Sequence, residues 1–432
     1  MSRAPKPSAE TPPQTLAVWL DDTAFGPLTR IGTLARSGLD SVRFAYDPTW
    51  LTHSRAFQLD PDLSLSAGDF YPKDSNFGVF LDSCPDRWGQ VLMKRRELVE
   101  ARQAERTRRE LRAWDFLLGV QDATRMGALR FSAVADGGQP LFLANEALAA
   151  PPLTQLGELQ QVALELTRKK QDDLSLLQQW LRVLVAPGAS LGGARPKANF
   201  QDGLGQLWIA KFPSADDDHD WALREILLHG LAHDCGIEVA PARLERFGQG
   251  YHTFVTRRFD RDGLNRRFFT SAMTLLNKSD QQEASYLDLA EFLATKGSDA
   301  HINRDLLQLF RRVLFNVATS NRDDHLRNHG FLRDPKGWRL APAYDMNPST
   351  RRDTHVLALD DQDTSPSLAT VLKTAAFYRV ADAQAVQICN AMLAVLAGWD
   401  ARAKQLGLSA EDRAELEDAF ATSLPQSGAG VH

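Results

Sequence analysis

The apolar residues of this 432-residue chain change their spacing along the sequence, and this change restricts the folds open to it. Residues 16–80 hold short apolar segments that alternate with polar residues and are separated by Gly, Asp and Pro, which is typical of antiparallel strands. After about residue 270 the apolar residues recur with the spacing of amphipathic helices. The sequence therefore predicts an α+β fold in which sheets precede a mainly helical part.

The same patterns predict individual elements. We expect strands at 16–20, 29–34, 42–46, 77–81, 128–134, 207–212, 251–261, 329–332 and 338–342. We expect helices at 85–120, 156–185, 221–236, 286–296, 304–320, 384–399 and 411–423. The Pro- and Ala-rich segment AAPPLT predicts a first domain boundary near residue 150.

Charge and composition exclude several classes of protein. The net charge of −5 and the isoelectric point of about 6.1 disfavour binding to nucleic acid through overall positive charge. No apolar run reaches the length of about 18 residues that a membrane span needs. The three cysteines form no CxxC pair and are odd in number, which disfavours a disulfide framework and fits a reducing compartment. Because the Pro-rich N-terminus also lacks the apolar core of a signal peptide, we expect a cytoplasmic protein.

A polar loop at residues 323–328 carries the strongest chemical signal. Asp323 and Asn328 have the spacing D-x-x-x-x-N, which is found in the catalytic loop of protein kinases. In such a loop the aspartate orients and deprotonates a hydroxyl, and the asparagine holds Mg²⁺ on the phosphates of ATP. The spacing favours Asp323 over Asp324 as the base. Asp345, which follows Asn328 by 17 residues in the segment APAYDMNP, could supply a second Mg²⁺ ligand.

Two residues upstream extend this pattern. Lys211 lies in the predicted strand LWIAKF, and Glu225 lies on the helix that follows. Kinases require a strand lysine that faces the ATP phosphates and a helix glutamate that pairs with it. The order Lys, Glu, Asp-x-x-x-x-Asn, Asp along one chain therefore favours phosphoryl transfer over a set of unrelated polar loops.

The segment APGASLGGARPK, residues 186–197, precedes the lysine strand and allows two interpretations. Its glycines suit a backbone that approaches phosphates closely. The segment also fits G-x-S-x-G, the nucleophile elbow of α/β-hydrolases, with Ser190 as nucleophile and Asp345 and His355 in suitable order. The helical segment before it and Pro196 after it disfavour this hydrolase alternative.

A zinc site is a further alternative. His325 and His329 are separated by four positions and could bind a metal together with Asp323. The chain lacks HExxH, and the two histidines do not fall on a predicted helix. We therefore prefer kinase chemistry to metal-dependent hydrolysis.

Taken together, the segments resemble the HipA-type serine/threonine kinase toxins, which are the kinase partners in bacterial toxin–antitoxin pairs. The resemblance extends from about residue 16 to 425 and rests on ASLGGARPK, IAKFP, RRFDR, DDHLRNHGF and PAYDMNP, and on RIGTLARSGLDSVRFAYDPTWL with its continuation to CPDRWG. It implies a two-lobed protein-kinase-like fold with an added N-terminal β-rich subdomain and a mainly helical C-terminal lobe. We expect a flexible tail at 1–15, the β-rich subdomain at 16–150, a region like the kinase N-lobe at 151–270 and the helical C-lobe at 271–432.

The resemblance also implies roles for individual residues. Asp323 would be the catalytic base, and Lys211 would contact the ATP phosphates beside Glu225. Asn328 and Asp345 would hold Mg²⁺. The remaining residues expected to bind nucleotide are Gly192, Gly193, Lys197, Arg258, Phe259 and His325, with Arg258–Asp260 as the hinge beside adenine. Ser190 would be a site of autophosphorylation that ejects the Gly-rich loop and silences the kinase.

The resemblance implies cofactors and partners as well. ATP and Mg²⁺ would be the cofactors, and the substrate would be an aminoacyl-tRNA synthetase, typically the glutamyl enzyme, whose phosphorylation stops translation and growth. A small helix-turn-helix antitoxin of HipB type would bind the chain, and operator DNA would be contacted mainly through that antitoxin. A rival from another class is a catalytically weak co-repressor module within an antitoxin–operator complex. The complete set of expected catalytic residues favours the enzyme.

Overall fold

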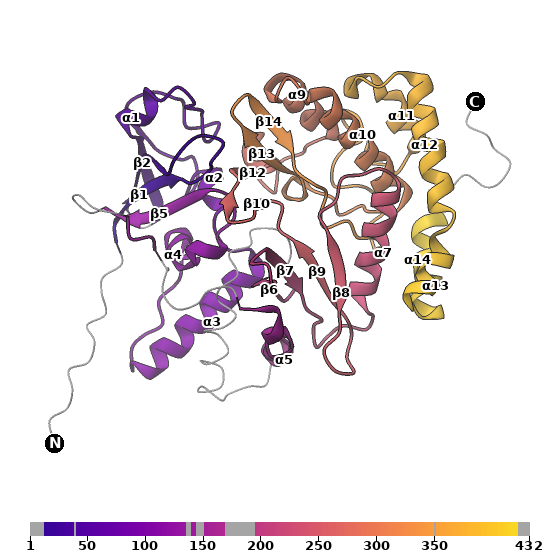
Figure 1. Cartoon of the computed structure of the whole chain (residues 1–432), viewed down its shortest axis with the longest axis horizontal. Helices are drawn as coiled ribbons and strands as arrows, with labels where there is room; N and C mark the ends of the chain where they lie inside the picture. Colours follow the sequence, from indigo (N-terminus) through magenta and orange to yellow (C-terminus); the bar gives the residue numbers. More distant parts are fainter. Residues whose placement is uncertain are drawn as a thin grey trace.

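The architecture was analysed in a computed structural model, which describes residues 13–421 apart from 39, 135–139, 144–150, 169–194 and 350. Figure 1 shows a β-rich part at the N-terminal end, a central sheet and a helical part at the C-terminal end. The predicted boundary near residue 150 lies outside the described residues.

The N-terminal part is built on a five-stranded antiparallel sheet. Its strands in spatial order are β4 (Asp69–Phe70), β3 (Ser41–Tyr46), β2 (Thr29–Ser37), β1 (Thr15–Leu20) and β5 (Leu129–Ala133). The helices that accompany the sheet are α1 (Pro48–Leu51), α2 (Gly78–Leu81), α3 (Arg87–Gln103), α4 (Ala113–Gly119) and the 3₁₀ turn η1 (Asp122–Thr124). Alternate residues of β1, Leu16, Val18 and Leu20, are buried in the core, as the alternating pattern predicts.

One predicted strand in this part is wrong. Residues 78–81 of this segment form α2, with Phe77 as its N-cap, and the N–H of Val79 donates to the Asp60 carboxylate at 2.9 Å. Gly78 allows this turn of helix to approach Thr274 closely, because an added Cβ would lie 2.5 Å from the Thr274 hydroxyl. A five-residue apolar run does not distinguish a strand from one helical turn, so these tertiary contacts decide its form.

The central sheet has four antiparallel strands. Their spatial order is β6 (Lys197–Gln201), β7 (Leu207–Lys211), β9 (Thr253–Arg257) and β8 (Ala242–Glu245). The 3₁₀ turn η2 (Leu153–Gln155) leads into α5 (Leu156–Thr167), which packs on β6, while α7 (Trp221–Asp234) packs on β8 and β9. Asp220 caps α7 by accepting from the N–H of Leu223 at 3.3 Å. Strands β6 and β8 were not predicted, because both are short and mix polar with apolar residues.

The C-terminal part combines a small sheet with most of the helices. The sheet has the order β12 (Phe269–Ser271), β13 (Gly330–Asp334) and β14 (Gly337–Leu340), and a hairpin of β10 (Arg261–Asp262) and β11 (Asn265–Arg266) precedes it. The helices are α8 (Ala272–Leu275), α9 (Tyr286–Lys296), α10 (Ile302–Ala318), α11 (Leu368–Lys373), α12 (Asp382–Leu396), α13 (Trp399–Leu406) and α14 (Ala410–Ala421), with 3₁₀ turns η3 (Leu326–Asn328) and η4 (Ala375–Tyr378). Strand β12 spans the domain boundary that we expected between residues 270 and 271. Within the described part of the chain, no helix combines the length and apolarity needed to cross a bilayer.

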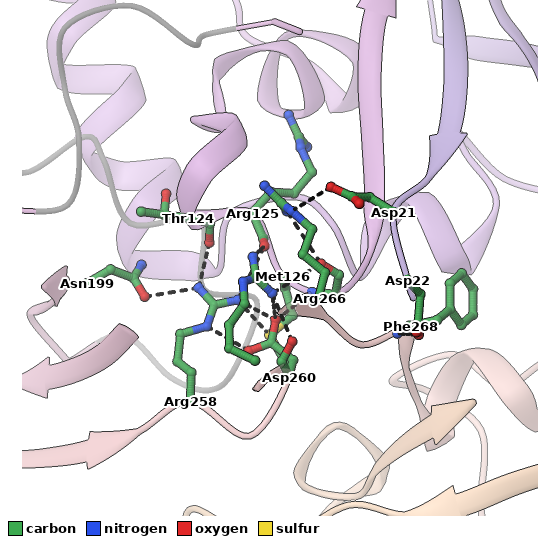
Figure 2. Close-up of polar contacts among 12 residues, drawn as sticks. Asp21, Asp22, Thr124, Arg125, Met126, Asn199, Arg258, Asp260, Arg266 and Phe268 are labelled. Carbon is green, nitrogen blue, oxygen red and sulfur yellow. Dashed lines mark hydrogen bonds and ion pairs between the residues drawn. The ribbon is translucent and has the colours of Figure 1, made fainter. Parts of the chain in front are cut away.

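A buried group of charged residues joins the N-terminal part to the segment after β9, as Figure 2 shows. The Arg258 guanidinium donates to Asp260 at 2.6 and 2.8 Å, to the Thr124 carbonyl at 2.6 Å and to Asn199 Oδ1 at 3.1 Å. The Asp260 carboxylate also accepts from the N–H of Gly127 at 2.7 Å. Burial opposes the ionisation of Asp260, but the neighbouring arginines outweigh it and hold its pKa well below the usual range.

Further contacts extend this group, and we call the whole the interdomain cluster: Asp22, Asp122, Arg258, Asp260 and Arg266. Arg266 donates to the Asp122 carbonyl at 2.6 Å, and Asp22 accepts from the N–H of Phe268 at 2.8 Å. These contacts connect residues that lie more than 130 positions apart in the sequence. Because each buried charge has a partner across the junction, the N-terminal part and the central sheet are held in one fixed arrangement.

Candidate active site

Three elements bring Lys211, Glu225 and Asp345 together, and we call this group the lysine cluster. Lys211 ends β7, Glu225 lies on α7 and Asp345 follows β14. The Lys211 Nζ donates to Glu225 Oε1 at 2.6 Å and to Asp345 Oδ1 at 2.9 Å. The three side chains, which are spread over 134 positions of sequence, thus meet at one ammonium group between the central sheet and the helical part.

The charges of the lysine cluster reinforce one another. Burial disfavours the charged form of Lys211, but Asp345 and Glu225 outweigh it and raise the pKa of the ammonium. The positive charge of Lys211, with smaller contributions from Lys197 and His325, lowers the pKa of Asp345 to about 2. Burial outweighs the charge of Lys211 at Glu225 and raises the pKa of that carboxyl, so the ionised oxygen ligand that the cluster offers a divalent cation is the Asp345 carboxylate.

The backbone at Asp345 is unusual. Its φ angle is 58°, in the left-handed region that non-glycine residues rarely adopt. Such conformations cost energy and persist where the surroundings fix them, which is frequent at functional sites. The contact with Lys211 is one interaction that fixes the Asp345 side chain in this conformation.

The two neighbouring aspartates of the polar loop differ sharply in environment. Asp324 is 4% exposed, and its Oδ2 lies 2.7 Å from Tyr286 Oη, 2.7 Å from Asn316 Nδ2 and 2.8 Å from His329 Nε2. The Asp323 side chain is 57% exposed. Asp324 therefore anchors the loop to α9 and α10, while Asp323 is accessible to a substrate.

Asp323 has one charged neighbour. The Arg352 Nε lies 3.0 Å from Asp323 Oδ1, and both side chains are about half exposed. An exposed pair of this kind contributes little to stability and exchanges readily with solvent. The assignment of Asp323 as the base stays a prediction, and this geometry is compatible with it.

Asn328 lies in η3 with a polar atom that lacks a partner. Asn328 is 5% exposed, and its Oδ1 accepts no hydrogen bond from any described residue. A buried carbonyl oxygen without a donor is costly, and a metal ion would satisfy it. Asn328 and the ionised Asp345 are together the kind of oxygen ligands that Mg²⁺ uses alongside phosphates and waters, so the residues present fit this ion.

The zinc alternative is not supported. His329 Nε2 lies 2.8 Å from the buried Asp324 carboxylate. Within the described ranges, no group of three or more His, Cys, Asp and Glu side chains is placed to hold a metal. The predicted set of His325, His329 and Asp323 therefore does not form a zinc site.

Of the remaining predicted nucleotide contacts, the structure describes Lys197, Phe259 and His325. Lys197 begins β6 and pairs in register with Lys211 of β7, and its Nζ lies 2.6 Å from Asp86 Oδ2. The Phe259 ring stacks on Tyr344 with a centroid distance of 5.5 Å and an interplanar angle of 22°. His325, at the start of η3, is half-buried. Gly192, Gly193 and Ser190 lie outside the described residues.

The hydrogen bonds of the Arg258 side chain hold it in the interdomain cluster. Its three guanidinium nitrogens donate to Asp260 and to the Thr124 carbonyl, and its side chain is fully buried. Only the main chain of Arg258 is left to contact a nucleotide, so a hinge formed by Arg258–Asp260 stays a prediction for the backbone alone. The sequence indicated that the segment RRFDR belongs to a site, but its contacts with the N-terminal part, among them those with Thr124 and Gly127, were not identifiable from spacing.

The described residues do not support the hydrolase alternative, which needs Asp345 to contact His355. Asp345 is bound to Lys211, and the carboxylate that acts most strongly on His355 is Asp324. Burial lowers the pKa of His355 to about 4. The described residues thus hold no contact between Asp345 and His355 like that of a nucleophile–base relay, and Ser190 lies outside them.

Sequence reasoning missed two charged residues at this site, Asp86 and Arg352. Asp86 belongs to the segment CPDRWG, and an Asp before a helical pattern signals an N-cap, which is a role that Asp86 does have. Its contact with Lys197 spans 111 residues and carries no local signal. Arg352 lies in a loop, where the spacing of residues does not show which way a side chain points.

The molecule belongs to the protein-kinase-like class. Its central sheet supplies Lys211, and its helical part supplies the polar loop at residues 323–328. Residues 16–132 match the HipA N-terminal domain, and residues 189–399 match the HipA-like C-terminal domain. Together these two matches cover more than two thirds of the chain. The chain belongs to the HipA family of kinases.

Known proteins agree with this placement. Over 149 residues the chain is 28% identical to the putative kinase Y4mE of Sinorhizobium fredii, a segment that covers 32% of this chain and 33% of that protein. Over 193 residues it is 26% identical to the serine/threonine-protein kinase toxin HipA of Shewanella oneidensis, which covers 37% of this chain and 43% of that protein. The matched segments thus span less than half the length of either relative.

A solved structure shares the fold over nearly the whole length. HipA of Shewanella oneidensis, in a complex with HipB and its operator DNA, matches with a TM-score of 0.65 and 17% identity, covering 95% of this chain and 96% of that chain. The predicted α+β, two-lobed kinase-like fold is confirmed.

Proposed function

We propose that this chain is an ATP-dependent protein kinase that phosphorylates serine or threonine. The observation that carries the proposal is the double contact of the Lys211 ammonium, with Glu225 at 2.6 Å and Asp345 at 2.9 Å. An active kinase needs the lysine–glutamate pair and the metal-binding aspartate in place at the same time. A co-repressor without catalytic activity would have no need of this arrangement.

The chain's own residues divide the chemistry among them. Lys211 contacts the phosphates of ATP, and Glu225 orients Lys211. Asp323 accepts the proton of the substrate hydroxyl as its oxygen attacks the γ-phosphorus. The bond from that phosphorus to the bridging oxygen breaks, and ADP leaves with the electron pair. Asp324 holds the loop in position through Tyr286, Asn316 and His329 without touching the substrate.

Asn328 and Asp345 are the residues that would hold Mg²⁺. When bound, Mg²⁺ neutralises the negative charge that develops on the phosphate oxygens. The unpartnered Asn328 Oδ1 and the low pKa of Asp345 support this assignment.

We further propose that the kinase acts as the toxin of a toxin–antitoxin system. The Shewanella oneidensis relative is named a kinase toxin, and its structure was solved with HipB and operator DNA. By that likeness, a HipB-type helix-turn-helix antitoxin would bind this chain and contact the DNA. The substrate would be an aminoacyl-tRNA synthetase of the glutamyl type, and autophosphorylation at Ser190 would inactivate the kinase.

A transfer assay tests the proposal. The purified full-length chain is incubated with Mg²⁺ and γ-labelled ATP, with and without bacterial glutamyl-tRNA synthetase, and labelled serine and threonine residues are mapped by mass spectrometry. We expect label on the synthetase and at Ser190. Absence of label on any protein, in a preparation that is folded and saturated with ATP, would contradict the kinase assignment. Label at Ser190 alone would leave the kinase standing and reject the synthetase.

A further inference from the structure

A second lysine faces the same side of the central sheet as Lys211. Lys197 of β6 and Lys211 of β7 are direct partners in an antiparallel pair, and opposed residues in such a pair project from the same face. On that side the Lys211 ammonium contacts Asp345 at 2.9 Å. The two lysine side chains thus project from the same face of the sheet.

The partner of Lys197 comes from the N-terminal part of the chain. Asp86 Oδ2 lies 2.6 Å from Lys197 Nζ, and the two side chains are only 6% and 2% exposed. The other carboxylate oxygen of Asp86 accepts from the N–H of Gly89 at 2.9 Å and caps α3. Because the cap fixes one oxygen, the other is held at a defined position over β6. A charge buried to this extent needs a counter-charge with well-fixed geometry.

The strand that carries Lys197 is held at a second point by the same junction. Asn199, two residues further along β6, accepts from Arg258 at 3.1 Å within the interdomain cluster, as Figure 2 shows. The N-terminal part therefore contacts β6 both at Lys197 and through the Arg258 network. Strand β6 is therefore held at two points, by Asp86 at Lys197 and by Arg258 at Asn199.

We infer that Asp86 is a positioning residue of the nucleotide site, which holds the Lys197 ammonium beside Lys211 so that both face the phosphates of ATP. This inference rests on the proposed function. The N-terminal part is then a component of the kinase site as well as a neighbouring domain. Asp86 acts only through Lys197 and touches no substrate atom.

A double-mutant cycle on the full-length chain tests this role. Calorimetric titrations with Mg²⁺-ATP and with adenosine compare the wild type, Asp86→Asn, Lys197→Met and the double variant. Asparagine is as good an N-cap as aspartate, so Asp86→Asn removes the charge while it keeps the cap of α3. Loss of one ionic hydrogen bond should weaken Mg²⁺-ATP binding about tenfold in each single variant. The double variant should be no weaker than Lys197→Met, and adenosine affinity should be unchanged throughout.

A control variant and several possible results separate this role of Asp86 from a purely structural one. Asp47→Asn changes another N-cap aspartate of the N-terminal part, that of α1, and should leave ATP affinity unchanged. If Asp86→Asn does not fold, Asp86→Ser replaces it, since serine also caps well. Unchanged or increased ATP affinity in Asp86→Asn, or in Asp86→Ser where that replaces it, overturns the inference. An equal loss of affinity for ATP and adenosine also overturns it. So does a loss of ATP affinity in the double variant that equals the sum of the losses in the two single variants. If the wild type itself does not bind Mg²⁺-ATP, the proposed function fails, and the inference with it.

Discussion

Two groups of buried charges, the interdomain cluster and the lysine cluster, differ in how completely their polar atoms are satisfied. In the interdomain cluster, Arg258 donates from all three of its guanidinium nitrogens, and Asp260 accepts from Arg258, Arg261 and the N–H of Gly127. In the lysine cluster, one ammonium serves two carboxylates, and nearby Asn328 keeps a buried oxygen without a donor. Asn199, which accepts from Arg258, also keeps a buried amide nitrogen without an acceptor, so the clearest difference is that the lysine cluster has one donor group for two carboxylates.

The residue types of the two clusters match this difference. Arginine has a planar guanidinium whose donors point in fixed directions, which suits a permanent junction. Lysine is a compact point charge on a flexible chain and can exchange a carboxylate for a phosphate with little rearrangement. Burial and charge alone therefore do not identify a functional site. In this chain the choice of lysine over arginine, and the sharing of one ammonium by two carboxylates, distinguish the proposed site from the structural ion-pair network.

The largest effect is expected at the polar loop. Asp323→Asn should lower the rate of phosphate transfer by about 10²–10⁴-fold, because an amide cannot accept the hydroxyl proton. Folding should be unaffected, since the Asp323 side chain is 57% exposed. Initial rates with labelled ATP and thermal unfolding of the same preparation measure both quantities.

Asp324→Asn is the matched comparison for that variant. Asp324 accepts from Tyr286 and Asn316, so its replacement should lower the free energy of unfolding by about 1–3 kcal/mol. Wild-type transfer by Asp323→Asn, or complete loss of transfer in a stably folded Asp324→Asn, would show that the base is misplaced.

The next effect concerns the interdomain cluster. Arg258→Met should lower the free energy of unfolding by about 3–5 kcal/mol, because it leaves Asp260 charged and buried without its main partner. Arg96→Met is the control, since Arg96 forms an exposed pair with Glu100 whose loss should cost under about 1 kcal/mol. Denaturant unfolding of both variants measures the difference. Equal stability of the two variants would show that the buried Arg258 pair stabilises the chain no more than the exposed Arg96–Glu100 pair does.

A smaller effect on the free energy of unfolding is expected when the pH is lowered and Asp345 becomes protonated. The pKa of Asp345 is lowered from 3.8 to about 2, so its contribution to stability is complete above about pH 4 and is lost as the pH falls through about 2. At about 1.4 kcal/mol for each pKa unit, the contribution amounts to about 2 kcal/mol. The stability difference between wild type and Asp345→Asn should therefore shrink over that range in denaturant titrations. A difference independent of pH would show that Lys211 does not stabilise the Asp345 carboxylate.

The sequence predicted much of the fold where periodicity was strong. Helix α9 was predicted with its observed ends, and α10 within two residues of both ends, because apolar residues recur along a full face. The prediction failed at α2, where Asp60 and Thr274 determine the form of one apolar turn. It also missed β6 and β8, whose short mixed sequences become strands only through pairing with β7 and β9.

For the candidate site, the sequence indicated the residues but not all of their neighbours. Lys211, Glu225 and Asp345 were grouped because kinase chemistry requires them in that order, and they do meet in space. The contact of Asp86 with Lys197 joins residues 111 positions apart, and no local pattern reveals such a pair. Long-range charge pairing of this kind becomes visible only when the fold is known.

The most direct test of the central claim is a titration of Mg²⁺-ATP into the wild type, Lys211→Met and Arg258→Met under conditions in which all three are folded. If the lysine cluster is the nucleotide site and the interdomain cluster is a junction, Lys211→Met should weaken binding at least about tenfold through the lost ionic contact with phosphate. Arg258→Met should weaken binding less than Lys211→Met does, because it removes one of the two points that hold β6 but no contact with the phosphates. Wild-type affinity in Lys211→Met, or a greater loss in Arg258→Met than in Lys211→Met, would contradict the account.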